Sequence, residues 1–316
     1  MNESLGVSAT RMSIYVETQV RGHLEDLWQR TQDPVLHKRW DLRFSEIDYL
    51  SRDGDEPQRF RYETRIGLGL RVRGEGESTG TRDGAAGERT SALRFWSDDP
   101  KSLIREGSGY WQYVPTADGV RFLTWYDYRT RFGPFGRLID RLLFRPLIGW
   151  ATAWSFDRLR LWIEQGIDPA LSLQRSLAHA TARIALAFVL LYQGLVPKLL
   201  YRHPSELIML TESGLSAETA SQVLVALGIA ELVLGAALFV TWRARWPFAV
   251  ILALMPVALV GLAITSPGTL VGAFNPVALN VAVAALAAVA WLTNADLPSA
   301  ARCLRARPAE GSGVSV

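Results

Sequence analysis

The residue with the clearest capacity for chemistry is Glu231, a lone carboxylate inside the apolar stretch 220–242. A charged carboxylate near the centre of a bilayer costs about 2.5–3.5 kcal/mol, and such residues usually pair, bind a ligand or carry a proton. Its helical neighbours at −3 and +4 are Gly228 and Gly235, and small residues let two helices approach closely. The sequence therefore predicts that Glu231 points into a helical bundle.

Four polar residues are candidates to meet Glu231 there. Arg183 and Lys198, on the preceding apolar segment, are candidate ion-pair partners, and Gln193 can donate a hydrogen bond. The predicted polar site consists of Gln193, Lys198, Glu231 and Asn275. Asn275, which a proline follows, also fits a helix N-cap. Two interpretations of Glu231 stay open: a ligand or proton site, and a buried pair that orients the helices.

Other chemistry-bearing residue types are sparse. The single cysteine, Cys303, excludes a disulfide framework, a CxxC redox pair and a thiolate metal cage. The four histidines, at positions 23, 37, 179 and 203, share no metal-ligand spacing. We find no nucleophile–base spacing. The sequence therefore identifies no catalytic residue, no metal site and no cofactor, and it favours a protein that is not an enzyme while leaving that question open.

The elements that must position these residues divide the chain into two parts. The first 170 residues contain 25 basic and 25 acidic side chains, whereas the remaining 146 contain only 9 and 6. The balanced first part has no basic surface for nucleic acid. The second part holds four apolar segments, at 178–196, 220–242, 246–265 and 276–293, each long enough to cross a bilayer core of ~30 Å.

The basic residues predict an orientation for these segments. One side carries the Arg243 and Arg245 turn and the Arg302, Arg305 and Arg307 tail, whereas the 266–275 loop on the other side has none. By the positive-inside rule, the first part and the tail are cytoplasmic. The start of the chain also lacks the apolar run of a signal peptide. We expect a multi-pass protein of the cell inner membrane with both termini in the cytoplasm.

The first part alternates between apolar and polar residues, as half-buried strands do. A strand at 13–20 precedes two short helices at 22–32 and 34–40, and turn clusters divide 44–131 into six more strands. The segment 135–165 has apolar residues at helical spacing and is expected to cover the sheet. This order predicts an α+β domain in which an antiparallel sheet wraps around a long C-terminal helix, followed by an all-α four-helix transmembrane bundle.

Aromatic residues dominate the covered face of this predicted sheet and its helix. The alternation places eight of them there: Phe60, Tyr62, Phe95, Phe122, Tyr126, Tyr128, Trp150 and Trp154. They either fill an ordinary core or line a ligand cavity. Three tyrosine hydroxyls on one covered face favour the cavity, because buried hydroxyls need partners that a ligand or water supplies.

The first part resembles a known superfamily. The element order, together with the opening run VETQVRGHLEDLWQRTQDPVLHKRWD, resembles the START-like SRPBCC superfamily, which has the helix-grip fold. The similarity covers 12–166. It implies a space between sheet and helix for an apolar or amphipathic small molecule, such as a lipid, an isoprenoid or a polyketide-like compound.

The second part resembles the DoxX-like membrane family over about 178–293. The resemblance rests on YQGLVPKLLYRHPSELIMLTESGL, then GIAELVLGAALF and AFNPVALNVAVAAL, the last of which contains Phe274, Asn275 and Pro276. Relatives are linked to quinone-dependent oxidation of sulfur compounds and to membrane oxidoreductase complexes. The resemblance thus allows quinone as a cofactor and oxidoreductase subunits as partners. The bundle contains no cysteine, which argues against thiol chemistry within it.

Together these patterns predict four regions and one preferred function. The regions are a helix-grip domain at 12–166, a linker at 167–177, a membrane domain at 178–296 and a basic, disordered tail at 297–316. The first hypothesis is a domain that binds a lipophilic molecule and hands it to the bundle, or senses it for the bundle. The alternatives are a quinone-linked oxidoreductase subunit with Glu231 as proton site, and an anchored interaction module without chemistry. The bilayer and a lipophilic molecule are the expected partners, and a homo-oligomer stays open.

Overall fold

The chain folds into two compact units. The computed structural model describes residues 13–308 except 53, 55, 68 and 274. One unit is formed by the chain up to Ser172 together with the segment that begins at Pro298, and the other is Leu173–Leu297. The second unit is therefore an insertion between two parts of the first.

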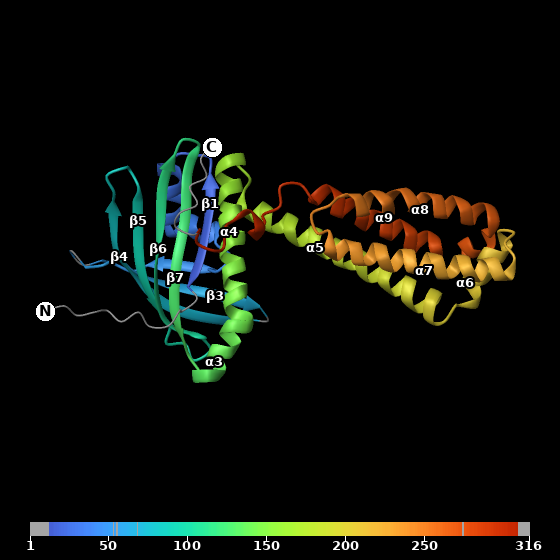
Figure 1. Ribbon diagram of the computed structural model, residues 1–316, viewed down its shortest axis with the longest axis horizontal. Coiled ribbons are helices and arrows are strands. Elements are labelled where there is room, and N and C mark those ends of the chain that lie inside the picture. The colour runs from blue at the N-terminus through green and yellow to red at the C-terminus, as the bar shows by residue number, and fades with distance from the viewer. Residues whose placement is uncertain (1–12, 53, 55, 68, 274, 309–316) are drawn as a thin grey trace. The chain divides into compact units, whose positions relative to one another are not determined.

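The first unit is built on a seven-stranded sheet in which each pair of neighbours is antiparallel (Figure 1). The spatial order is β1-β7-β6-β5-β4-β3-β2. The strands are β1 (Ile14–Val20), β2 (Glu46–Tyr49), β3 (Arg59–Gly67), β4 (Leu70–Asp83), β5 (Arg89–Trp96), β6 (Ile104–Thr116) and β7 (Gly119–Thr130). Strands β1 and β2 are the two edge strands. Because β1 pairs with β7, the first strand of the chain lies beside the last.

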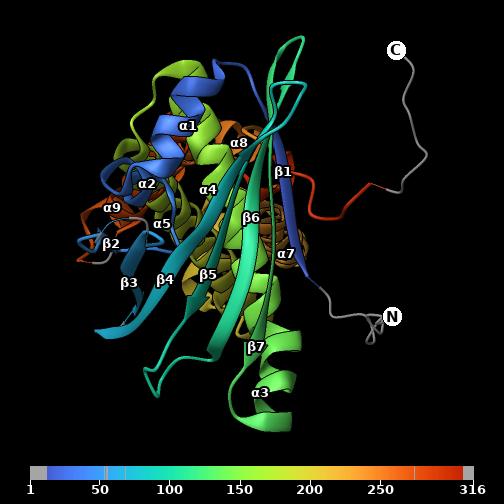
Figure 2. The ribbon, with the colours of Figure 1, turned by 90° about the vertical axis from the view of Figure 1, so that its left-hand side faces the viewer.

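Helices cover one face of this sheet, which we call the inner face. The two short ones are α1 (Leu24–Gln32) and α2 (Pro34–Trp40), and the Asp33 side chain caps α2 by accepting from the Val35 backbone nitrogen at 2.8 Å. After the sheet come α3 (Gly133–Ile139), a π-helical turn (Asp140–Phe144) and α4 (Arg145–Gln165). In Figure 2, α1 and α2 lie toward one end of α4 and α3 lies at the other.

The long helix α4 packs against the inner face through aromatic rings. Phe156 of α4 stacks on Phe122 of β7 with ring centroids 4.4 Å apart, and both side chains are fully buried. The predicted α+β domain, an antiparallel sheet around a long C-terminal helix, is confirmed.

The segment after the last membrane helix belongs to the first unit. Glu17 and Leu304 exchange backbone hydrogen bonds of 2.9 Å in both directions, and the buried Cys303 donates from Sγ to the Ala153 carbonyl at 3.2 Å. The prediction of a disordered tail from 297 is wrong for this segment. Its Leu304 backbone bridges Glu17 on the open edge of β1, a contact that apolar patterning does not reveal. Residues 309–316 lie outside the described part.

The second unit contains the apolar helices. Its elements are α5 (Pro169–Gln193, which begins in the first unit), a π-helical stretch (Gly194–Leu200), α6 (Pro204–Glu212), α7 (Ala217–Val240), α8 (Trp246–Thr265), a 3₁₀ turn (Pro267–Val271) and α9 (Pro276–Thr293). Residues 169–177, expected as linker, are the first turns of α5.

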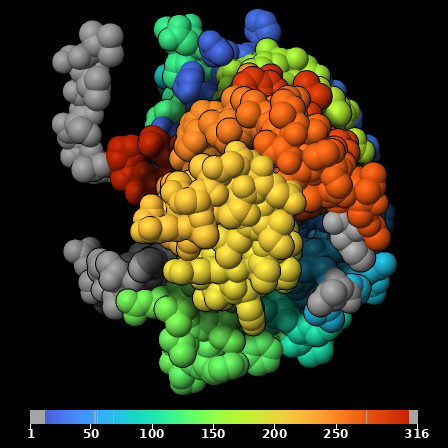
Figure 3. Space-filling view, turned by 90° about the vertical axis from the view of Figure 1, so that its right-hand side faces the viewer, coloured from blue at the N-terminus to red at the C-terminus, as the bar shows by residue number. Residues whose placement is uncertain are grey.

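Four helical segments of this unit are long and apolar enough to cross a membrane. They are Pro169–Leu200, Ala217–Val240, Trp246–Thr265 and Pro276–Thr293, with mean hydropathies of 1.5, 2.6, 2.6 and 1.9. Small residues such as Ala187, Ala287 and Ala290 pack the centre, whereas large apolar side chains such as Val240 and Leu292 are exposed at the surface. Figure 3 shows the end of this unit at which α6 lies, in yellow. An apolar exterior of this kind suits contact with lipid.

Candidate functional site

Two carboxylates of the second unit lie close to Lys198. Its Nζ lies 3.1 Å from Oε2 of Glu231 on α7 and 3.8 Å from Oε1 of Glu206 on α6. The Lys198 side chain is 9% exposed and that of Glu231 is 28% exposed. A cation so little exposed needs an ionic partner, and here two carboxylates surround it.

Local chain geometry brings Lys198 within reach of Glu231. Pro197 interrupts the helix that would continue from α5, and the chain passes into a π-helical stretch. A Cβ on Gly194 would lie 2.6 Å from the Gly228 carbonyl oxygen, so only glycine allows the two helices to approach this closely. The small face of α7 thus serves the close helix contact that the sequence predicts.

The other two members of the predicted polar site take different roles. Asn275 caps α9: its Oδ1 accepts from the Ala278 backbone nitrogen at 3.0 Å, as the N-cap interpretation has it. Gln193 is half-buried, and within the described residues it makes no hydrogen bond to Lys198 or Glu231. Phe274, next to Asn275 in the motif, lies outside the described residues. The structure therefore brings together Lys198 and Glu231 and adds Glu206, which belongs to a motif of the DoxX-like resemblance but was not among the predicted site residues.

Arg183 is not the partner of Glu231. Its fully buried guanidinium donates from Nε to the Leu238 carbonyl at 2.5 Å and from Nη2 to the Thr241 carbonyl. The ring centroids of Trp242 and Phe248 lie 5.3 and 4.9 Å from the guanidinium carbon. Arg183 thus satisfies the open carbonyls at the C-terminus of α7.

In the first unit, part of the inner face is a closed aromatic core. The rings that pack there are Trp40, Trp111, Tyr113, Phe122 and Phe156, none of which is more than 8% exposed. Phe122, which we expected in a cavity wall, contacts Tyr113, Trp111 and Phe156 and belongs to this core. At this end the aromatic residues fill space in the ordinary way.

Over β3, β4 and β5 the inner face is more open. Three predicted lining residues, Phe60, Tyr62 and Phe95, are half-buried here. Each ring lies across a glycine of the neighbouring strand: a Cβ on Gly76, Gly74 or Gly107 would fall within 2.4 Å of it. Because glycine has no side chain, the rings can lie against the sheet.

The remaining predicted lining residues have partners within the protein. Tyr126 and Thr152 share a side-chain hydrogen bond of 2.9 Å, and Tyr128 donates to Asp140 Oδ1 at 2.6 Å. The expectation that these two hydroxyls need a ligand or water therefore does not hold. Trp154 is buried at 7% exposure, whereas Trp150 is 42% exposed. Among the described residues the Tyr62 hydroxyl has only a long hydrogen bond, 3.4 Å, to the Trp96 carbonyl, and burial raises the pKa of Tyr62 to about 12.

A charged group missing from the sequence predictions lies near these rings. Arg43 donates to both carboxylate oxygens of the buried Asp41, at 2.9 and 2.6 Å, and His37 Nε2 lies 3.0 Å from Asp41 Oδ2. Burial alone would raise the pKa of Asp41, but Arg43 and His37 outweigh it and hold that pKa well below its ordinary value. The His37–Asp41 spacing of four residues at the end of a helix was the available signal.

This pair places a positive charge beside aromatic rings. The guanidinium carbon of Arg43 lies 5.4 Å from the Phe44 ring centroid and 5.6 Å from that of Tyr126. Its side chain is 13% exposed. Asp41 holds the guanidinium by two parallel hydrogen bonds, a geometry that fixes its direction.

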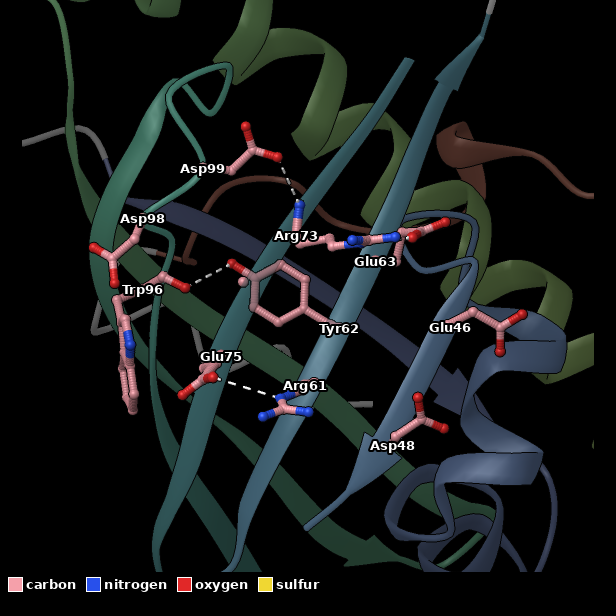
Figure 4. Close-up of a pocket in the computed structure, with 11 residues that line it drawn as sticks. Glu46, Asp48, Arg61, Tyr62, Glu63, Arg73, Glu75, Trp96, Asp98 and Asp99 are labelled. Atoms are coloured by element: carbon pink, nitrogen blue, oxygen red, sulfur yellow. Dashed lines mark hydrogen bonds and ion pairs between the residues drawn. The ribbon is translucent and has the colours of Figure 1, made fainter. Parts of the chain in front are cut away.

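A hollow on the other face of the sheet is of another kind. It has a volume of about 560 Å³ and is lined mainly by charged residues of β2, β3, β4 and the turn after β5 (Figure 4). By strand alternation these residues face away from α4. Glu63 there lies within 4 Å of Arg65, Arg71 and Arg73. Of the predicted lining residues only Tyr62 borders it, and we interpret it as a surface ion-pair network of small energetic weight.

Comparison with known proteins identifies the second unit. A membrane protein with four apolar helices and an α+β domain is the class that the structure defines. The model of the DoxX-like family matches residues 187–288. An uncharacterized membrane protein of Bacillus subtilis (strain 168), YndG, is 51% identical over 182 residues, which cover 57% of this chain and 68% of that protein. The chain belongs to the DoxX-like family.

The solved structures that resemble this chain each cover no more than about half of it. A STAR-related lipid transfer protein from Xanthomonas axonopodis is 18% identical with a TM-score of 0.37, over 48% of this chain and 85% of that one. The Zhui aromatase/cyclase from Streptomyces sp. R1128 is 12% identical with a TM-score of 0.37, over 49% and 96%. The helix-grip assignment rests on this chain's own strand order and on α4.

Proposed function

We propose that the first unit binds an apolar or amphipathic small molecule at the open half of its inner face and passes it to, or senses it for, the membrane unit. The observation that carries the proposal is a difference in burial between aromatic residues on the inner face of the sheet. Phe122 and its neighbours are closed over by α2 and α4, whereas Phe60, Tyr62 and Phe95 are left half-buried. Aromatic faces left in this state offer a large apolar contact area.

The chemistry of the surface suggests what the molecule looks like. Its apolar body would lie on the rings of Phe60, Tyr62 and Phe95, and a polar or anionic head would turn toward Arg43. The buried Asp41 carboxylate keeps that guanidinium in place. A lipid, an isoprenoid or a polyketide-like compound fits this description. The membrane is a natural source and destination, because transfer from one apolar environment to another avoids water.

The test uses the full chain, because residues from 298 onward complete the first unit. Protein purified from membranes is extracted with organic solvent and the extract is analysed by mass spectrometry, while a fluorescent fatty acid reports binding directly. Phe95→Asp places a charge on the inner face, and Trp96→Asp places the same charge on the outer face of the same strand. We expect Phe95→Asp alone to lose the bound molecule. A chain that carries no apolar compound and binds no probe would contradict the proposal, as would equal loss in both variants.

A second candidate function concerns the membrane unit. The Lys198–Glu231 pair lies beside another carboxylate, Glu206. Lys198 is on a π-helical stretch, and such irregular helices are frequent at functional sites. A carboxylate beside a lysine can exchange a proton, which a quinone-linked oxidoreductase would require. In native membranes, Glu231→Gln should abolish quinone-coupled activity, whereas Glu218→Gln, at the exposed start of α7, should leave it unchanged. Full activity in Glu231→Gln would exclude the proton role.

A further inference from the structure

The segment that joins the sheet to α4 exposes an unusual amount of apolar side chain. It comprises the end of the β7–α3 turn, α3, the π-helical turn and the first residues of α4, that is 132–147. Six large apolar residues on it are between 52% and 70% exposed: Phe132, Phe135, Leu138, Leu142, Leu143 and Leu147. Contiguous exposure on this scale in a folded domain marks a surface that meets a partner or a membrane.

The opposite side of this segment is tied firmly to the sheet. Asp140 accepts from Tyr128 at 2.6 Å and from Arg145 Nε at 2.9 Å, and Arg145 also lies 3.3 Å from Asp127. The guanidinium of Arg145 stacks over the Tyr128 ring, 4.4 Å from its centroid. These bonds fix which side of the segment faces the sheet. The apolar side is therefore held outward by the fold.

Basic residues accompany the apolar ones. Arg137 and Arg141 are exposed, one helical turn apart, and among the described residues neither forms an ion pair. The acidic residue between them, Asp140, is buried and already bound to Arg145. The outward side thus presents large apolar side chains together with two arginines and no free carboxylate. This composition characterises helices that lie in the headgroup region of anionic membranes.

We propose that segment 132–147 is a membrane-docking element: its apolar side chains enter the headgroup region of an anionic bilayer, and Arg137 and Arg141 bind lipid phosphates. The occupant is a bilayer because the same chain carries four helices long and apolar enough to cross one, and because the exposed charges are positive, which complements anionic lipid. The element is independent of the small molecule that the inner face binds.

The experiment measures how deeply the segment enters lipid in the full chain. A nitroxide label is attached at Leu142→Cys or, as the control, at Val35→Cys, an exposed apolar position on α2 of the same unit, both in a Cys303→Ala background. The protein is reconstituted in vesicles of phosphatidylcholine with or without phosphatidylglycerol. Accessibility to oxygen and to a water-soluble nickel complex is then compared. We expect a severalfold higher oxygen-to-nickel ratio at 142 than at 35, most strongly with phosphatidylglycerol.

Charge variants separate the role of the arginines from that of the apolar residues. Arg137→Gln with Arg141→Gln should remove the phosphatidylglycerol dependence at position 142, and because both side chains are exposed the fold should persist. A label at 142 as exposed to water as the label at 35, in both kinds of vesicle, would overturn the proposal. Burial at 142 that occurs in detergent and increases with protein concentration would also overturn it, since a second copy would then cover the segment.

Discussion

Lys198 and Glu231 form an ion pair of 3.1 Å between two helices that touch through glycines. Neither charge is fully in water, and the second carboxylate, Glu206, is 3.8 Å from the same nitrogen. The pair therefore depends on the close approach of Gly194 and Gly228 as much as on its own attraction. The contribution of the two charges and that of the close helix approach can be tested by separate substitutions.

Removing one charge should be worse than removing both. Lys198→Met leaves Glu231 without its partner and should cost roughly 1–3 kcal/mol of stability, because an unpaired charge or polar group away from water is expensive. The double variant Lys198→Met, Glu231→Leu should recover most of this loss. Thermal unfolding in detergent, followed by size-exclusion chromatography with fluorescence detection, compares the three proteins. Equal losses in the single and double variants would show that the pair is not coupled.

Gly228 should tolerate no side chain, in contrast to a glycine elsewhere in the bundle. A Cβ at Gly228 would lie 3.0 Å from the Gly194 carbonyl oxygen and from the Lys198 and Leu199 side chains, whereas a Cβ at Gly261 meets nothing within 4 Å. Gly228→Val should therefore lower the midpoint of thermal unfolding and separate the Lys198–Glu231 pair, while Gly261→Val should be close to neutral. A neutral Gly228→Val would mean that the helices are not in contact there.

The reactivity of the buried Cys303 thiol should report whether the C-terminal segment is packed against the first unit. Burial, with help from Asp157, raises the pKa of this thiol to about 12, so the folded unit holds the proton more tightly than the unfolded chain. This contribution to stability is present below about pH 8.5, the ordinary thiol value, and is lost as pH rises toward 12. Maleimide should react slowly with the native protein at neutral pH.

Asp157 provides the variant for that experiment. Its buried carboxylate accepts from the Ser299 backbone nitrogen at 2.7 Å and from Arg302 at 3.1 Å. Asp157→Asn removes the charge from these bonds and should increase Cys303 labelling about tenfold, the effect of about 1.4 kcal/mol, within the range for a hydrogen bond to a charged group. Asp118→Asn, in the β6–β7 turn, serves as the control. Fast labelling of the unmodified protein would mean that the segment is not docked.

Asp41 should make the first unit sensitive to acid. Its folded pKa is held below the ordinary value, so the stabilisation is complete above about pH 4 and is lost as the pH falls below that. Asp41→Asn should therefore flatten the decline in stability between neutral pH and about pH 3, at the cost of lower stability at pH 7. Asp48→Asn, at an exposed position on β2, should keep the original profile. The measurement is thermal unfolding as a function of pH.

Much of the fold was available from the sequence because backbone geometry sets its periods. Side chains alternate along a strand whatever the fold, so residues such as Phe60, Phe95 and Phe122 were correctly placed on one face. Periodicity does not say how far the helices cover that face. Phe122 is sealed by Phe156 whereas Phe95 is half-buried, and this difference arises from the position of α2 and α4.

The site in the membrane unit shows a similar division. The apolar pattern of the sequence predicted that Glu231 lies in a helical bundle, and Arg183 and Lys198 were its two candidate basic partners. The choice between these two residues required the structure at the C-terminal end of α7. There Arg183 donates hydrogen bonds to the Leu238 and Thr241 carbonyls and does not pair with Glu231. The C-terminal segment was missed for a comparable reason: its contact with Glu17 is made by the backbone of Leu304, which no side-chain pattern encodes.

Because Leu304 pairs with β1, the first unit contains chain from both before and after the four apolar helices. Both flanking parts must then be on the same side of the membrane, which an even number of crossings allows. There is also a consequence for biosynthesis. The ribosome makes Leu304 only after α9, so Glu17 on the edge of β1 lacks this backbone partner until all four apolar helices have been made. A chain that ends before this segment would leave the Glu17 backbone N–H and C=O on that edge without their partner.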